Sequence, residues 1–84
     1  MHLTEREINE MLGKRPVYYI KDTDGGWYLK RKRWDREGCC LSLTWTHDRS
    51  DATPYRKELT AIEIKDRIRV DYERETVEVL QVWN

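Results

Sequence analysis

The sequence lacks several features that mark particular protein classes. It has no phenylalanine, only two prolines and two cysteines, and no apolar run long enough for a membrane span or a signal peptide. The formal net charge is zero, whereas a chain built mainly to bind nucleic acid usually has a basic balance. No catalytic motif is recognisable, so we expect a protein that is not an enzyme and that uses no cofactor.

The two cysteines, Cys39 and Cys40, are adjacent. Neighbouring residues on a strand point to opposite faces, so a disulfide between them would be strained. His2 and His47 are isolated in the sequence and complete no metal-ligand pattern. We therefore expect reduced cysteines, no metal site, no targeting segment and a cytoplasmic location.

With 84 residues, the chain has the length of one small domain. Hydrophobic and charged residues each make up 38%, which predicts a thin core under a densely charged surface. Four tryptophans and five tyrosines supply core area, because each large ring buries about 150–250 Å². The charge is uneven: residues 16–57 carry a net charge of +3, and residues 58–84 carry −3.

A short helix is predicted over residues 4–12. Thr4 and Glu7 have the spacing of a capping box, and Gly13 suits the position after the last turn. A helix this short is marginal alone. Its apolar stripe is therefore expected to dock on the rest of the chain; the stripe consists of Ile8, Met11 and Leu12.

Three strands are predicted within residues 17–46, separated by turns at 22–26 and 35–38. In the third, residues 39–46, alternation directs Cys39, Leu41, Leu43 and Trp45 toward the core. In the second, a strict period of two gives two faces. One face carries Trp27, Leu29, Arg31 and Arg33, and the other carries Tyr28, Lys30, Lys32 and Trp34.

The segment 57–71 is predicted to be a helix, because Ala61, Ile64 and Ile68 fall on one helical face. Thr60 and Glu63 also have capping-box spacing. The competing interpretation is a strand over residues 67–72 that forms a hairpin with residues 76–83. Residues 76–83 are predicted to be a strand in both interpretations. The expected fold is α+β: a short N-terminal helix, a three-stranded antiparallel meander, a second helix packed on the sheet, and a C-terminal strand.

The centre of the chain resembles a recurrent pattern in small phage and prophage proteins, W-T-x-D-x-x-x-A-x-x-aromatic followed by a helix and a strand. The resemblance implies a small phage-type accessory protein in the cytoplasm of a bacterial host, a class that includes inhibitors of defence systems such as CRISPR nucleases. The residues alone indicate a structural brace that locks the third strand to the second helix. The matching positions are Trp45, Thr46, Asp48, Ala52, Tyr55, Ala61, Ile64, Ile68, Val77 and Val79.

Two surfaces are candidates for function. The first is the basic stretch 30–36, with five bases in seven residues. If Trp27 and Leu29 face the core, an aromatic and basic stripe is exposed, formed by Tyr28, Lys30, Lys32 and Trp34 and continued by Arg36. Three interpretations remain open: a protein-binding surface, a nucleic-acid platform, or an edge strand protected by charge.

The second surface is the acidic side of the predicted helix, with Glu63 and Asp66. Acidic groups there would fit the basic groove of a nuclease; the alternative is a solvated face with ion pairs such as Glu63–Arg67. We expect this helix and the basic strand to be held apart. His47, Asp48 and Asp51 are expected to shape a turn. The expected partner is a host protein, for example a defence nuclease complex, with nucleic acid as the alternative; no membrane is expected, and the oligomeric state stays open.

Overall fold

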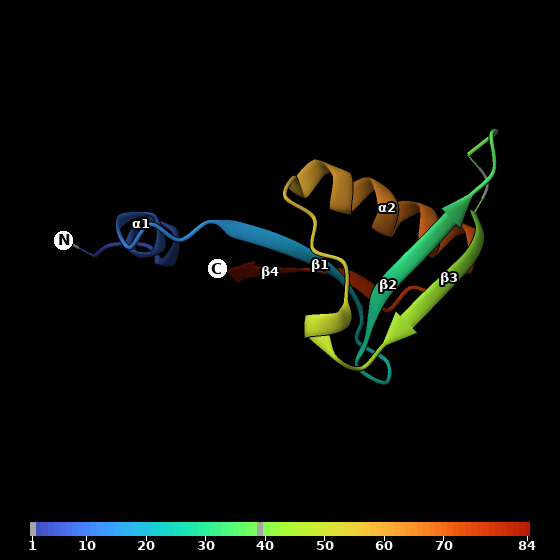
Figure 1. Cartoon of the computed structure of the whole chain (residues 1–84), viewed down its shortest axis with the longest axis horizontal. Helices are drawn as coiled ribbons and strands as arrows, with labels where there is room; N and C mark the ends of the chain where they lie inside the picture. The colour runs from blue at the N-terminus through green and yellow to red at the C-terminus, as the bar shows by residue number, and fades with distance from the viewer. Residues whose placement is uncertain (1, 39) are drawn as a thin grey trace.

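The computed structural model describes residues 2–38 and 40–84, and it has an α+β fold with two helices and a four-stranded antiparallel sheet (Figure 1). The strands lie in the order β3-β2-β1-β4. Among the residues described, neither helix is both long and apolar enough to cross a membrane. In chain order the elements are α1 (Glu5–Met11), β1 (Pro16–Asp22), β2 (Trp27–Trp34), β3 (Cys40–Thr46), the 3₁₀ turn η1 (Arg49–Asp51), α2 (Glu58–Asp71) and β4 (Val77–Trp83).

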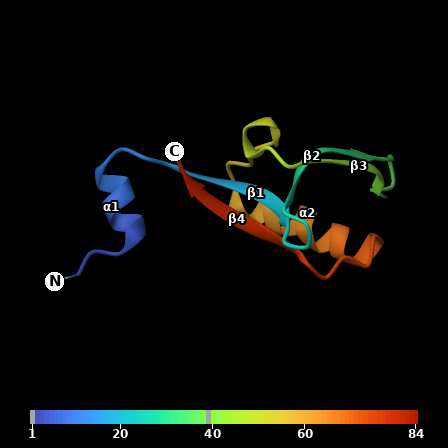
Figure 2. The same cartoon turned by 90° about the horizontal axis from the view of Figure 1, so that it is seen from below.

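The second helix packs on one face of the sheet (Figure 2). The core lies between the helix and the strands. The buried residues of the helix, Ala61, Ile64 and Ile68, have the predicted helical spacing, so the helical prediction is confirmed and the competing strand is wrong. The helix begins at Glu58 with no side-chain cap, hence the capping box expected at Thr60 is absent. The buried core cluster consists of Ile20, Leu29, Ile64, Ile68 and Val77.

The predicted meander of β1, β2 and β3 is present, but β1 and β2 separate soon after their turn. They pair only at Lys21–Tyr28 and Asp22–Trp27. Farther along, the loop that follows η1 fills the wedge between them: the Thr53 N–H donates to the Leu29 carbonyl at 3.2 Å. Tyr55 exchanges two backbone hydrogen bonds with Tyr18, at 2.7 and 2.8 Å. The loop therefore replaces strand pairing where the two strands diverge.

The residues of the phage-like pattern lie in and around this wedge. Trp45 and Tyr55 pack against the core cluster, and Ala52 is buried. Burial raises the pKa of the Tyr55 phenol. Leu43 also faces the core as predicted, whereas the predictions for Cys39 and for the side chain of Leu41 lie outside the described part of the chain.

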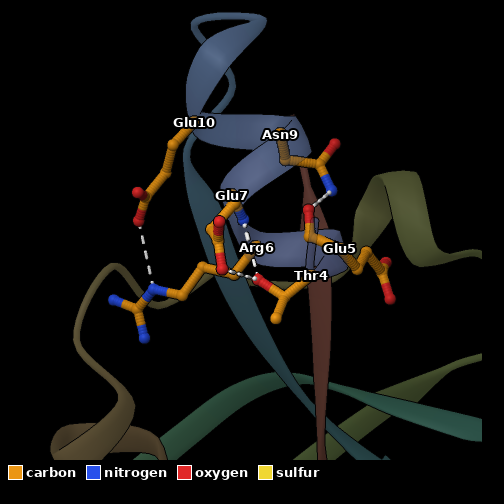
Figure 3. A network of polar contacts seen from close by, with 6 residues as sticks. All are labelled: Thr4, Glu5, Arg6, Glu7, Asn9 and Glu10. Atoms are coloured by element: carbon orange, nitrogen blue, oxygen red, sulfur yellow. Dashed lines mark hydrogen bonds and ion pairs between the residues drawn. The ribbon is translucent and has the colours of Figure 1, made fainter. Parts of the chain in front are cut away.

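The first helix forms as predicted but does not dock. The Thr4 hydroxyl accepts a hydrogen bond from the Glu7 N–H at 3.2 Å and donates to the Glu7 carboxylate at 3.1 Å (Figure 3). Gly13 follows the helix with φ +75°, a conformation that glycine adopts without steric cost. Yet α1 has no buried residue, and it extends past the end of β1 (Figure 1). The apolar side chains of α1 and of the residues beside it are 45–75% exposed: Leu3, Ile8, Met11 and Leu12.

Candidate functional site

A β-bulge in β2 rearranges the predicted basic stripe. The pairing with β3 shifts between Leu29 and Arg31, which leaves Lys30 as an extra residue. After the bulge, Lys32 lies opposite Leu43, a core-facing residue. Residues paired across antiparallel strands share a face, so Lys32 is directed toward α2.

The face assignment made from strict alternation is therefore wrong beyond Leu29. Trp34 packs against the core cluster on the α2 side. Arg31 and Arg33, predicted to share the face of Leu29, are exposed on the opposite face, where they pair with Thr44 and Ser42. One extra residue shifts a period-two pattern, which moves every later side chain to the other face.

The other predicted members of the stripe have separate surroundings. Tyr28 lies on the face away from α2, where its ring makes an edge contact with Tyr19 at 6.4 Å between centroids. Lys30 is paired with Asp51 of η1 at 2.9 Å. Arg36 is exposed in the turn between β2 and β3. The seven residues 30–36 thus do not present one continuous basic surface.

The structure instead brings part of the basic strand and part of the acidic helix into one open groove of about 630 Å³. Lys32 and Trp34 line it from β2, and Glu63 and Asp66 line it from α2. The expectation that these two surfaces are held apart is therefore wrong. The full lining is Lys32, Trp34, Thr60, Glu63, Ile64, Asp66 and Arg67.

Half-buried Trp34 is the central aromatic of this groove. The Arg67 guanidinium lies 4.9 Å from its ring centroid, and the Lys32 ammonium lies 5.7 Å away. Both distances are within the range of cation–π attraction, worth about 0.5–1 kcal/mol at exposed sites. Lys32 is also 6.0 Å from the centroid of Tyr55. The ring and its two cations thus form a connected unit.

Arg67 also fixes the far end of the groove. Its Nη1 donates to the carbonyl of Gly38 at 2.8 Å, which ties the β2–β3 turn to α2. Gly38 has φ +82°, and a Cβ placed there would lie 3.1 Å from the guanidinium, so glycine suits this close approach. The alternative interpretation of the acidic helix face included an ion pair between Arg67 and Glu63, and no such pair is found among the salt bridges of the described chain.

A second polar cluster, which the sequence reasoning did not identify, surrounds buried Asp22. Its carboxylate accepts hydrogen bonds from the Thr76 hydroxyl at 2.6 Å, the Asp24 N–H at 3.0 Å and the Arg74 guanidinium at 2.9 Å. Burial alone would raise the pKa of Asp22, but these hydrogen bonds and the Arg74 charge outweigh burial and lower it. Arg74 also lies 5.5 Å from the Trp45 ring centroid. This cluster joins the β1–β2 turn to the segment before β4.

The polar turn after β3 has the structural role expected from its sequence. Asp48 caps η1, and hydrogen bonds from the Ser50 hydroxyl and N–H hold the pKa of Asp48 below its ordinary value. The His47 ring stacks on Trp27 with 3.4 Å between centroids. Among the described residues, no group of three or more histidine, cysteine, aspartate or glutamate side chains is placed to hold a metal ion.

The groove between β2 and α2 is therefore the site that joins most of the residues singled out from the sequence. Its walls carry both signs of charge around one aromatic ring, and such a surface suits noncovalent recognition. No protein-family model, curated protein or solved structure matches this chain.

Proposed function

We propose that this chain is a non-enzymatic binding protein that occupies a surface of another protein through the groove between β2 and α2. The observation that carries the proposal is the placement of Trp34, flanked by Lys32 and Arg67, opposite the carboxylates of Glu63 and Asp66. Tryptophan and arginine are enriched among the residues that dominate protein–protein binding energy. The resemblance of the central segment adds the biological setting: a phage-type accessory protein that blocks a host protein, such as a defence nuclease complex.

The charge distribution favours a protein over a nucleic acid as the partner. The Glu63 carboxylate in the groove would repel phosphates, and Lys30 is already paired with Asp51. A polypeptide can offer complementary charges to both walls and an apolar side chain to Trp34. The alternative partner, nucleic acid bound along residues 28–36, would have to contact lysine and arginine side chains that point in different directions.

The test is a pull-down from nuclease-treated bacterial lysate, followed by calorimetry with the purified retained protein. Glu63→Arg changes the groove wall, and Glu75→Arg makes the same charge change at an exposed position outside the groove. We expect Glu75→Arg to bind like the wild type. Glu63→Arg and Trp34→Ala are expected to weaken binding at least tenfold, about 1.4 kcal/mol or more.

Two outcomes would contradict the proposal. If both groove variants bind the retained protein as tightly as the wild type, the groove is not the contact surface. If the chain retains no protein but binds generic DNA or RNA with steep salt dependence, it is a nucleic-acid-binding module.

The anti-defence setting is tested by a separate plaque assay. Expression of this chain in cells with an active defence nuclease should restore plaque formation by a targeted phage. The Glu63→Arg variant should not restore it.

A further inference from the structure

The edge of β4 offers a row of backbone groups directed away from the sheet. β4 is the last strand in the order β3-β2-β1-β4, so only its β1 side is paired. Arg15 and Asn84 exchange two hydrogen bonds, and the Thr23 N–H donates to the Thr76 carbonyl. In an antiparallel ladder these bonded pairs alternate. The even-numbered residues of β4 thus bond to β1, and four residues direct their N–H and C=O groups outward: Val77, Val79, Gln81 and Trp83.

The loop contact on the other side of β1 supports this assignment independently. Tyr18 is paired with Gln81 in the register of β1 and β4. Its N–H and C=O bond to Tyr55, on the side away from β4. Tyr18 therefore makes no ladder hydrogen bonds with β4, and Gln81 opposite it is directed to the free edge.

The two edges of this sheet are unequally protected. The β2–β3 ladder has register shifts at Leu29/Arg31 and at Arg33/Trp34, and such irregularities twist an edge away from further pairing. The β1–β4 ladder runs through seven consecutive pairs without a shift. β4 contains neither proline nor lysine, and its single charged residue is Glu78. A long, regular, apolar edge of this kind is prone to pair with another strand.

The sequence of β4 is compatible with pairing to itself. When two copies run antiparallel with Leu80 opposite Leu80, Val77 lies opposite Trp83 and Val79 opposite Gln81. All four residues direct their backbone groups outward. Each free N–H and C=O group of one edge therefore faces a hydrogen-bonding partner on the second copy. Glu78 then lies opposite Val82, so no like charges oppose each other.

We infer that this chain forms a two-fold homodimer in which β4 pairs with β4 of a second copy, centred on Leu80. The dimer extends the sheet through both copies and places both α2 helices on the same face. The side of α2 nearest β4 carries Glu58 and Ile62, whereas Glu63 and Arg67 line the groove near β2. The groove of each copy therefore stays open.

Sedimentation equilibrium tests the assembly. The wild type is expected at twice the chain mass of 10.3 kDa. Gln81→Pro removes one outward N–H while leaving the bonds of β4 to β1 intact, and proline is tolerated on edge strands for that reason. We expect it to raise the dimer dissociation constant at least tenfold. Gln81→Thr keeps the N–H and serves as the matched control, which is expected to dimerise like the wild type.

Cysteine cross-linking tests the register and does not depend on the proline variant folding. In a background with Cys39→Ser and Cys40→Ser, Leu80→Cys places two thiols in a close pair, with Cα atoms about 4.5 Å apart. Mild oxidation should then give a covalent dimer. In the same background, Glu78→Cys places the thiols four positions apart along the strands, about 13 Å, and should give none.

Three results would overturn the inference. The first is a wild-type chain that stays monomeric up to about 0.5 mM. A β4 dimer with a dissociation constant below about 1 mM would be measurably populated at that concentration. A dimer that persists unchanged in folded Gln81→Pro uses another surface. A dimer that cross-links through Glu78→Cys but not through Leu80→Cys has another register.

Discussion

Asp22→Asn is the substitution whose effect follows most directly from the structure. Asp22 is 3% exposed and accepts three hydrogen bonds, from Thr76, Asp24 and Arg74. Asparagine has nearly the same shape and can still accept from Thr76 and the Asp24 N–H. It removes the negative charge, so the Arg74 guanidinium loses its ion pair.

The expected cost is about 2 kcal/mol in the free energy of unfolding. A hydrogen bond to a charged group contributes about 1.5–3 kcal/mol. Breaking a fully buried ion pair costs about 3–5 kcal/mol, but the Arg74 side chain is 45% exposed and can turn to water, which places the effect at the lower end. Small domains have unfolding free energies of only about 5–15 kcal/mol, so this loss is easily measured.

Urea denaturation followed by tryptophan fluorescence measures this loss, since Trp27 and Trp45 lie beside Arg74. Asp24→Asn in the same turn is the matched control, because Asp24 contributes its backbone N–H to the cluster. We expect the control to change the free energy of unfolding by less than about 0.5 kcal/mol. If the two variants lose the same amount, the Asp22 carboxylate does not hold this end of the sheet.

The pH dependence checks the cause. Because the folded-state pKa of Asp22 lies below the ordinary value of 3.8, the unfolded chain takes up its proton first as the pH falls. The stabilisation is therefore complete above about pH 5 and is lost as the pH falls through 3.8 toward the folded pKa. The difference between wild type and Asp22→Asn should shrink in this range. A difference that stays constant from pH 6 to pH 3 would refute the ion-pair explanation.

Two further predictions concern the first helix and the Tyr18 phenol. Removal of residues 1–12 should change the free energy of unfolding by less than about 0.5 kcal/mol, because α1 buries no residue; a loss above about 1 kcal/mol in the same denaturation assay would mean that α1 docks. Burial, the Glu58 charge and a hydrogen bond to Glu58 raise the pKa of Tyr18, so stability should fall as the pH rises above 10. Tyr18→Phe should make that decline shallower, and an unchanged slope would contradict the assignment.

Much of the local structure follows from short-range patterns in the sequence. The capping residues of the first helix, the glycine turns and the helical spacing of Ala61, Ile64 and Ile68 all predict the observed elements, because each depends on neighbours within about one turn. The alternation in β3 also places Leu43 and Trp45 correctly on the core side. These features are encoded by residues close together in the chain.

The arrangement of the candidate site depends on contacts between distant residues. Lys30 and Arg31 are both basic, so the sequence contains no break that marks the bulge, and alternation alone sends Lys32 and Trp34 to the wrong face. The Asp22 cluster is equally hidden, since Arg74 and Thr76 lie more than 50 positions away and Asp22 reads as an ordinary turn residue. Even the apolar stripe of α1 indicates a packed helix, although α1 buries none of its residues.

The sequence by itself thus determined which segments become helices and strands. Only the tertiary structure decided which charged side chains share a surface, because the bulge at Lys30 sets the direction of the β2 side chains that follow it.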